Sequence, residues 1–193
     1  MTSWYWVRHG PTHAKAMIGW SDLPADLSDR DALKRLSDAL PRDAKVISSD
    51  LIRAKDTATA IEGGRPRLAH RTGLREMHYG DWEGLGFQEI NERAPALARE
   101  FWENPGKAAP PGGESWNTFS QRIAREIDAI SAEHPDTSLV AVAHFGVILA
   151  ALQHATRMPP RHVFSFKIDN LSVTKLEMLP GGKWRVLGVN HLP

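Results

Sequence analysis

The sequence predicts an α/β protein built around parallel strands, and two apolar runs carry this prediction. Residues 4–7 are aromatic or β-branched, which favours a packed strand, and Gly10 and Pro11 follow closely enough to end it. Residues 139–143 are apolar throughout, as is typical of a central parallel strand covered on both faces. Both strands are therefore expected to end at the sheet edge where open α/β folds bind ligands.

Helices are expected between and after these strands, from the spacing of apolar residues and from their end signals. The predicted helices cover residues 28–40, 51–61, 115–134 and 147–156. Pro41 ends the first of them, and Asp50 is expected to cap the second. The third has the clearest apolar stripe, which begins at Trp116.

The remaining pattern indicates further strands and one irregular region. Strands are predicted over residues 46–47, 67–70, 164–168, 171–179 and 184–189. Gly181 and Gly182 form the expected hairpin turn between the last two. Residues 72–113 are punctuated by glycine and contain two short helical patterns, over 87–92 and 96–103. We interpret 72–113 as a pocket-lining insertion in a single domain that spans residues 1–193.

The composition excludes some classes of function. The formal net charge is only +1 and the charges are intermixed, which gives no support to nucleic-acid or membrane-surface binding. There is no cysteine, so disulfides and thiolate chemistry are excluded and a cytoplasmic location is expected. No signal peptide or membrane-spanning segment is expected either. The chain leaves open whether the protein is a monomer or a homodimer.

Polar residues follow three of the predicted strands. Arg8 and His9 follow the first, Arg53 lies in the first turn of the helix after the second, and His144 follows the central strand. Each residue alone is ordinary: an arginine on a helix is usually solvated, and a buried histidine is usually a satisfied core residue. Parallel strands place all three junctions at one edge, however, and arginines and histidines around one hole make an anion site.

Six segments together resemble the histidine phosphatase superfamily, the phosphoglycerate mutase-like family. They are RHGPT (8–12), SSDLIRA with TA (48–54, 57–58), LRE with GDWEG (74–76, 80–84), PGGES (111–115), VAH (142–144) and NLS (170–172). The resemblance implies a three-layer α/β sandwich, with a mostly parallel central sheet, helices on both faces and a helical insertion over the active site.

The resemblance also implies roles for five residues. His9 is the nucleophile that takes up a phosphoryl group, Arg8, Arg53 and His144 hold its oxygens, and Glu76 donates and accepts protons. These roles agree with the chemistry, because a neutral imidazole is nucleophilic and fixed cations stabilise the charge of a transferring phosphoryl group. No cofactor and no metal are expected.

The expected activity is metal-independent hydrolysis of a small-molecule phosphomonoester through a phosphohistidine, as in a histidine-type acid phosphatase. Phosphoglycerate mutase-type transfer is one alternative, and an inactive phosphate-binding or interaction module is another. Thr12, Trp20, Tyr79 and Phe145 are candidates for substrate binding. Phe145 stands where the family usually has glycine, and its ring is expected to narrow or shield the pocket. The sequence does not identify the substrate.

Overall fold

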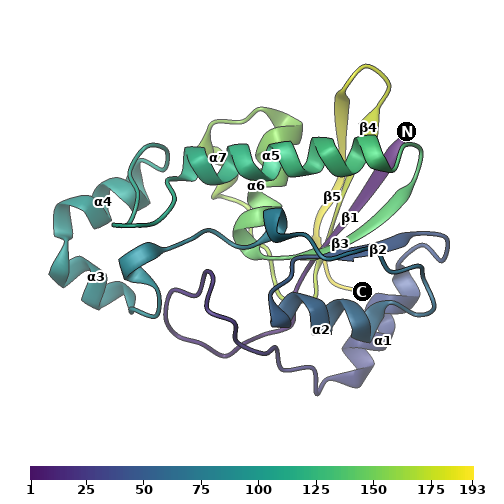
Figure 1. Ribbon diagram of the computed structural model, residues 1–193, viewed down its shortest axis with the longest axis horizontal. Helices are drawn as coiled ribbons and strands as arrows, with labels where there is room; N and C mark the ends of the chain where they lie inside the picture. The colour runs from purple at the N-terminus through teal and green to yellow at the C-terminus, as the bar shows by residue number, and fades with distance from the viewer.

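A computed structural model describes residues 1–193 as a five-stranded sheet with helices on both faces (Figure 1). The strands are β1 (Thr2–Arg8), β2 (Lys45–Ser48), β3 (Ser138–Ala143), β4 (Val173–Leu179) and β5 (Lys183–His191). Their order in the sheet is β2-β3-β1-β4-β5. The neighbours β2, β3 and β1 are parallel, whereas β4 and β5 continue the sheet in antiparallel fashion through a hairpin at Gly181 and Gly182.

Helices cover both faces of the sheet (Figure 1). The helices are α1 (Arg30–Ala39), α2 (Ile52–Ile61), α3 (Phe87–Arg93), α4 (Pro95–Glu103), α5 (Trp116–Glu133), α6 (Phe145–Thr156) and α7 (Pro160–Val163). One apolar core joins the sheet to α5 and α6, and a second joins it to α1 and α2. The three-layer α/β architecture with a parallel centre is thus confirmed. No helix has both the length and the apolar character needed to cross a membrane.

The position of β3 in the centre of the sheet explains why its sequence is apolar throughout. Successive strand residues point to opposite faces of a sheet. Leu139 and Ala141 pack into the core beneath α5 and α6, while Val140 and Val142 pack into the core beneath α1 and α2. A strand buried on both faces has no position for a polar side chain, which is why residues 139–143 predict it correctly.

The register of the parallel strands aligns their carboxyl ends. Arg8 at the end of β1 lies opposite Ala143 at the end of β3, and Ser48 at the end of β2 lies opposite Val142. His9 and His144 are the next residues after β1 and β3, so they leave the sheet at the same edge.

The prediction that Asp50 caps α2 is wrong. The helix begins after Leu51, which makes no side-chain cap. The first amide of α2, that of Ile52, donates instead to Asp22 Oδ1 at 2.6 Å. Asp50 accepts two hydrogen bonds from the Arg75 guanidinium, at 2.8 and 2.6 Å. A charged bidentate donor binds a carboxylate more strongly than a neutral amide does, which explains the exchange of partners.

Two of the predicted strands are also wrong. Residues 164–168 follow the short helix α7 as turns, and no strand lies beside them to complete a ladder. Residues 67–70 make only an isolated bridge between Arg67 and Val46, so they add no strand to the sheet. Alternating apolar residues do not form a strand without a partner edge.

Residues 72–113 contain α3, α4 and two 3-10 turns, Thr72–Leu74 and Gly80–Trp82. The α3–α4 pair lies at one end of the molecule, away from the sheet (Figure 1). Gly80 adopts φ +53°, and a Cβ there would lie 2.0 Å from the Pro111 carbonyl oxygen. The chain therefore needs glycine where the segment after Glu76 meets residues 111–113.

We expect Gly80→Ala to lower the free energy of unfolding by about 2–4 kcal/mol, from the left-handed backbone together with the steric overlap. Gly64→Ala is the matched control, because Gly64 also has positive φ but a Cβ added there would meet no heavy atom within 4 Å. It should lose only about 1 kcal/mol. Urea unfolding measures the free energy of unfolding of both variants. Equal losses would show that the close contact with residues 111–113 contributes nothing to the cost of Gly80→Ala.

Candidate active site

A cavity of about 140 Å³ lies at the carboxyl end of β1. Its ionisable lining residues are Arg8, His9, Arg53 and Glu76. Thr12, Phe145 and three apolar residues of the loop after Thr12 complete the wall. Residues that are distant in the sequence thus meet at the sheet edge, as the three strand junctions predict.

The His9 ring is held in one orientation by its own neighbour. His9 Nδ1–H donates to the Gly10 carbonyl oxygen at 2.6 Å, which leaves Nε2 as the nitrogen with the lone pair. Burial lowers the pKa of His9 to about 3, and the positive charges of Arg53 and Arg8 act in the same direction. The imidazole is therefore neutral near neutral pH, as a nucleophile must be.

His144 lies against His9 and is fully buried, with the two ring centroids 5.1 Å apart. It does not line the cavity itself. Burial, with the nearby cations, holds its pKa well below the usual range, which favours the donating, neutral ring over the protonated one. Neither ring nitrogen has a hydrogen-bond partner in the protein. A buried N–H without a partner is costly, and a ligand oxygen can satisfy it.

Backbone carbonyls, rather than carboxylates, fix the two arginines. Arg8 Nη1 donates to the Ile168 carbonyl at 2.6 Å. Arg53 donates from Nη1 to Ser21 and from Nη2 to Gly19, at 2.8 and 2.6 Å. Because neither guanidinium forms an ion pair, both positive charges remain available to an anion in the cavity.

Thr57 and Asn170 bind the backbone of the loop that follows β1. The Gly10 amide donates to Thr57 Oγ1 at 3.0 Å, and that hydroxyl donates to the Arg53 carbonyl at 2.7 Å. Asn170 Nδ2 donates to the His9 carbonyl at 2.7 Å. His9 and Arg53 are therefore held in a fixed relation to each other, although neither Thr57 nor Asn170 is a predicted site residue.

Glu76 contributes a buried carboxyl to the wall of the same cavity. Its Oε1 accepts from the Met77 amide at 3.0 Å, and its Oε2 accepts from the Gly146 amide at 3.1 Å. Burial raises the pKa of Glu76, although the two amides and the cavity arginines oppose this effect. A carboxyl with a raised pKa is suited to giving and taking a proton.

The backbone of Glu76 is clamped by Arg122 of α5, a residue that sequence reasoning missed. Arg122 donates to the carbonyls of Gly73, Arg75 and Glu76 at 2.9, 3.0 and 3.2 Å. It also makes a bidentate pair with Glu114, at 2.8 and 2.7 Å. Arg122 is 46 residues from Glu76 in the chain, so no local pattern indicates the contact.

The other substrate-binding candidates are dispersed. Trp20 lines neither the cavity beside His9 nor the apolar one next to it, and its indole nitrogen donates to the Glu76 carbonyl at 2.8 Å. Tyr79 lines the neighbouring apolar cavity, and Phe145 lines both cavities. No group of three or more His, Asp or Glu side chains is arranged to hold a metal ion.

This α/β fold brings a neutral histidine, two arginines without ion-pair partners and a buried carboxyl around one small cavity, an arrangement whose uncompensated positive charge suits a compact anion. A family model described as histidine phosphatase superfamily (branch 1) matches residues 4–191. The chain belongs to this superfamily.

The similar proteins have different names. Phosphoglycerate mutase-like protein 4 of Arabidopsis thaliana is 33% identical, over 96% of this chain and 85% of the relative. Glucosyl-3-phosphoglycerate phosphatase of Mycobacterium tuberculosis is 40% identical, over 59% of this chain and 55% of the relative. The solved structure of Bacillus stearothermophilus YhfR superposes with a TM-score of 0.88 at 30% identity, over 97% of this chain and 96% of that chain.

We expect Arg122→Lys to lower kcat on a phosphate ester by about ten- to a hundredfold while KM changes little, because lysine cannot hold three carbonyls and a carboxylate at once and Glu76 shifts. Arg125→Lys, an exposed substitution on the same helix, is the control and should leave both constants unchanged. Steady-state kinetics with a melting curve for each variant make the test. A matched fall in kcat and in the folded fraction would contradict a positioning role.

Proposed function

We propose that this protein is a metal-independent phosphomonoester hydrolase, a histidine-type acid phosphatase, which acts on a small phosphorylated metabolite through a phosphohistidine intermediate. The supporting observation is that a neutral His9, the unpaired Arg8 and Arg53, and the buried Glu76 line one cavity of about 140 Å³. In this proposal the chain is one domain, and residues 72–113 are its pocket-lining insertion.

The first half-reaction transfers the phosphoryl group to His9. The Nε2 lone pair attacks phosphorus, the ester P–O bond breaks, and the leaving oxygen takes the proton of the Glu76 carboxyl. Arg8 and Arg53 hold the phosphoryl oxygens as their charge redistributes, and the His144 ring, which lies beside His9 and has no hydrogen-bond partner in the protein, donates one N–H to them. The products are the alcohol, phosphohistidine and the Glu76 carboxylate.

The second half-reaction returns the enzyme to its starting state. The Glu76 carboxylate takes a proton from water, whose oxygen attacks phosphorus as the P–Nε2 bond breaks. Inorganic phosphate leaves, His9 is again neutral, and Glu76 is again protonated. A mutase differs from this scheme only in its acceptor, a second alcohol in place of water.

We expect His9→Ala to lower the hydrolysis of 4-nitrophenyl phosphate by at least about a thousandfold, because no other group replaces the nucleophile. The wild type should keep full activity in excess chelator, and brief reaction with a radiolabelled ester should leave acid-labile, alkali-stable label on the protein. Activity that disappears with chelator, or a His9→Ala variant that retains it, would overturn the mechanism.

We expect Glu76→Gln to affect poor leaving groups most. An alkyl phosphate needs the proton of Glu76 and should lose about 10²–10⁴-fold, whereas 4-nitrophenyl phosphate should lose much less in its first step. Because the pKa of Glu76 is raised, the proton is present at acid pH and is lost as the pH rises, so kcat/KM for the alkyl ester should fall on the alkaline side. Glu76→Gln should abolish this pH dependence. If kcat/KM still falls on the alkaline side in the variant, the titrating group is not Glu76.

A further inference from the structure

A second cavity, of about 290 Å³, lies next to the one that contains His9, and Phe145 lines both. This volume is near the lower end of the range for small-molecule sites. Twelve residues line the cavity; none carries a charge, and more than half are aromatic. We refer to it as the aromatic cavity.

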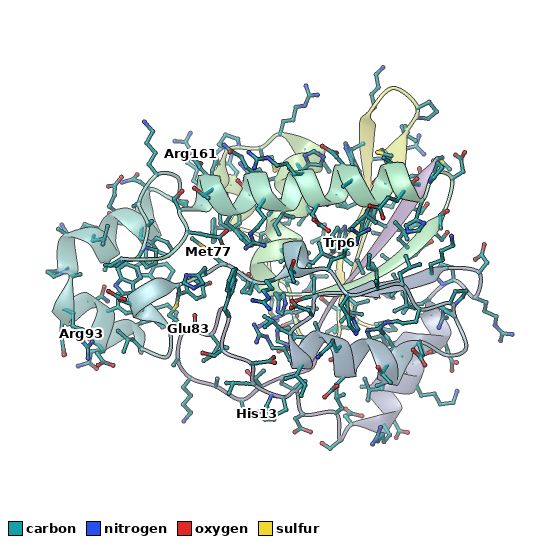
Figure 2. All side chains as sticks on the ribbon, in the orientation of Figure 1. Trp6, His13, Met77, Glu83, Arg93 and Arg161 are labelled. Carbon is teal, nitrogen blue, oxygen red and sulfur yellow. The ribbon has the colours of Figure 1, made fainter.

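The position of Glu76 connects the two cavities. Its carboxyl lines the cavity beside His9, and Gly146, whose amide binds Glu76 Oε2, lines the aromatic cavity. Met77, the residue after Glu76, also lines the aromatic cavity and lies between the α3–α4 pair and the sheet (Figure 2). A leaving oxygen that received the Glu76 proton would lie at this boundary, and the aromatic cavity is the neighbouring space for its carbon skeleton.

The aromatic cavity offers little to a polar alcohol. Trp116 lines it, but its indole N–H already donates to Gln153 at 2.7 Å. Tyr79 supplies a hydroxyl, and burial together with the carboxyls of Glu76 and Glu83 raises its pKa so that it stays protonated. No lysine lines either cavity, and the only arginines are Arg8 and Arg53 beside His9.

These contacts decide which alcohol fits. A carboxylate or second phosphate in the aromatic cavity would lose its hydration without gaining a cationic partner, which is costly. An aromatic ring would stack against Phe145, Trp102 and the rings beside them at no such cost. The ring of Phe145 is itself anchored by the Arg8 guanidinium, 5.4 Å from its centroid, so the wall between the cavities is fixed to the phosphoryl site.

We propose that the substrate is the phosphomonoester of an uncharged, ring-bearing apolar alcohol, and that Phe145 and the aromatic cavity select it. This proposal rests on the proposed hydrolase function and names the class of its substrate. It assigns to 2-naphthyl phosphate a much better fit than to 3-phosphoglycerate, whose alcohol carries a carboxylate.

The exposed aromatic rings at the aromatic cavity suggest an alternative occupant, a second copy of the chain. Phe87 is 56% exposed and Phe164 is 41% exposed, and both line the aromatic cavity. A second copy of the chain would also cover such rings. The shared wall with the cavity beside His9 favours a substrate, because a subunit interface needs no connection to Glu76.

The first test measures kcat and KM for 2-naphthyl phosphate, ethyl phosphate and 3-phosphoglycerate. Because an aryl ester also has the better leaving group, the fit is judged from KM, which we expect to be at least about tenfold lower for 2-naphthyl phosphate than for 3-phosphoglycerate. Trp102→Ala should lower kcat/KM for 2-naphthyl phosphate by about five- to tenfold and leave that for ethyl phosphate unchanged, since its alcohol is too short to reach that ring. Trp184→Ala is the matched control, because Trp184 lies on β5 outside both cavities.

Phe145→Ala tests the wall itself. Loss of the ring should raise KM for 2-naphthyl phosphate and reduce the preference over 3-phosphoglycerate by about fivefold or more, with melting curves to confirm folding. An unchanged preference in both Phe145→Ala and Trp102→Ala, or a wild type that hydrolyses 3-phosphoglycerate as well as 2-naphthyl phosphate, would overturn the proposal.

Binding measurements test the substrate class independently of the proposed hydrolase function. Calorimetry of His9→Ala with 2-naphthyl phosphate and with 3-phosphoglycerate reports selectivity without turnover, and we expect the same order of affinity. Selective binding with no hydrolysis of any ester by the wild type would remove the hydrolase function and leave the aromatic cavity assigned. Hydrolysis without selectivity, in a dimer that Phe87→Ser dissociates, would identify a subunit interface and overturn the substrate class.

Discussion

The parallel pairing of β1 with β3 is the constraint on which the candidate site depends. Arg8 lies opposite Ala143, so His9 and His144 leave adjacent strands at the same level and their rings come within 5.1 Å. A slip of one residue in this register would turn every inward side chain to the wrong face and separate the two histidines. Burial on both faces of β3 opposes such a slip, so the packing of the core also fixes the geometry of the chemistry.

Glu76 does not follow a strand of the sheet, so strand register does not position it. Tertiary contacts position it instead. Arg122 and Trp20 bind its carbonyl oxygen, while the amides of Met77 and Gly146 bind its carboxyl oxygens. The proposed acid is therefore placed by its neighbour Met77 and by groups from three distant parts of the chain. Its raised pKa follows from the same arrangement, since the contacts that position the carboxyl also remove it from water.

The sequence predicted those parts of the structure that depend on residues close together in the chain. The strands of the parallel centre, the amphipathic helix α5, and the polar residues after β1, β2 and β3 all follow from neighbouring residues. Asp50 was misassigned because its partner, Arg75, lies 25 residues away and competes with the local amide. Arg122 escaped notice for the same reason, and residues 164–168 resembled a strand because the pattern cannot report whether a neighbouring strand exists.

In the proposed reaction, phosphoryl transfer and substrate selection take place in two neighbouring cavities, and Phe145 lines both. Arg8 and Arg53 line the cavity beside His9 and not the aromatic cavity, so neither can recognise a second acidic group there. Residues that follow Glu76 contribute aromatic walls instead of charges. Most residues that line the aromatic cavity belong to residues 72–113, and the others include Met17, Trp116 and Phe164, so selectivity can vary there without a change at the sheet edge. An apolar wall there means that discrimination arises from desolvation, which penalises charged alcohols more than it rewards any one apolar shape.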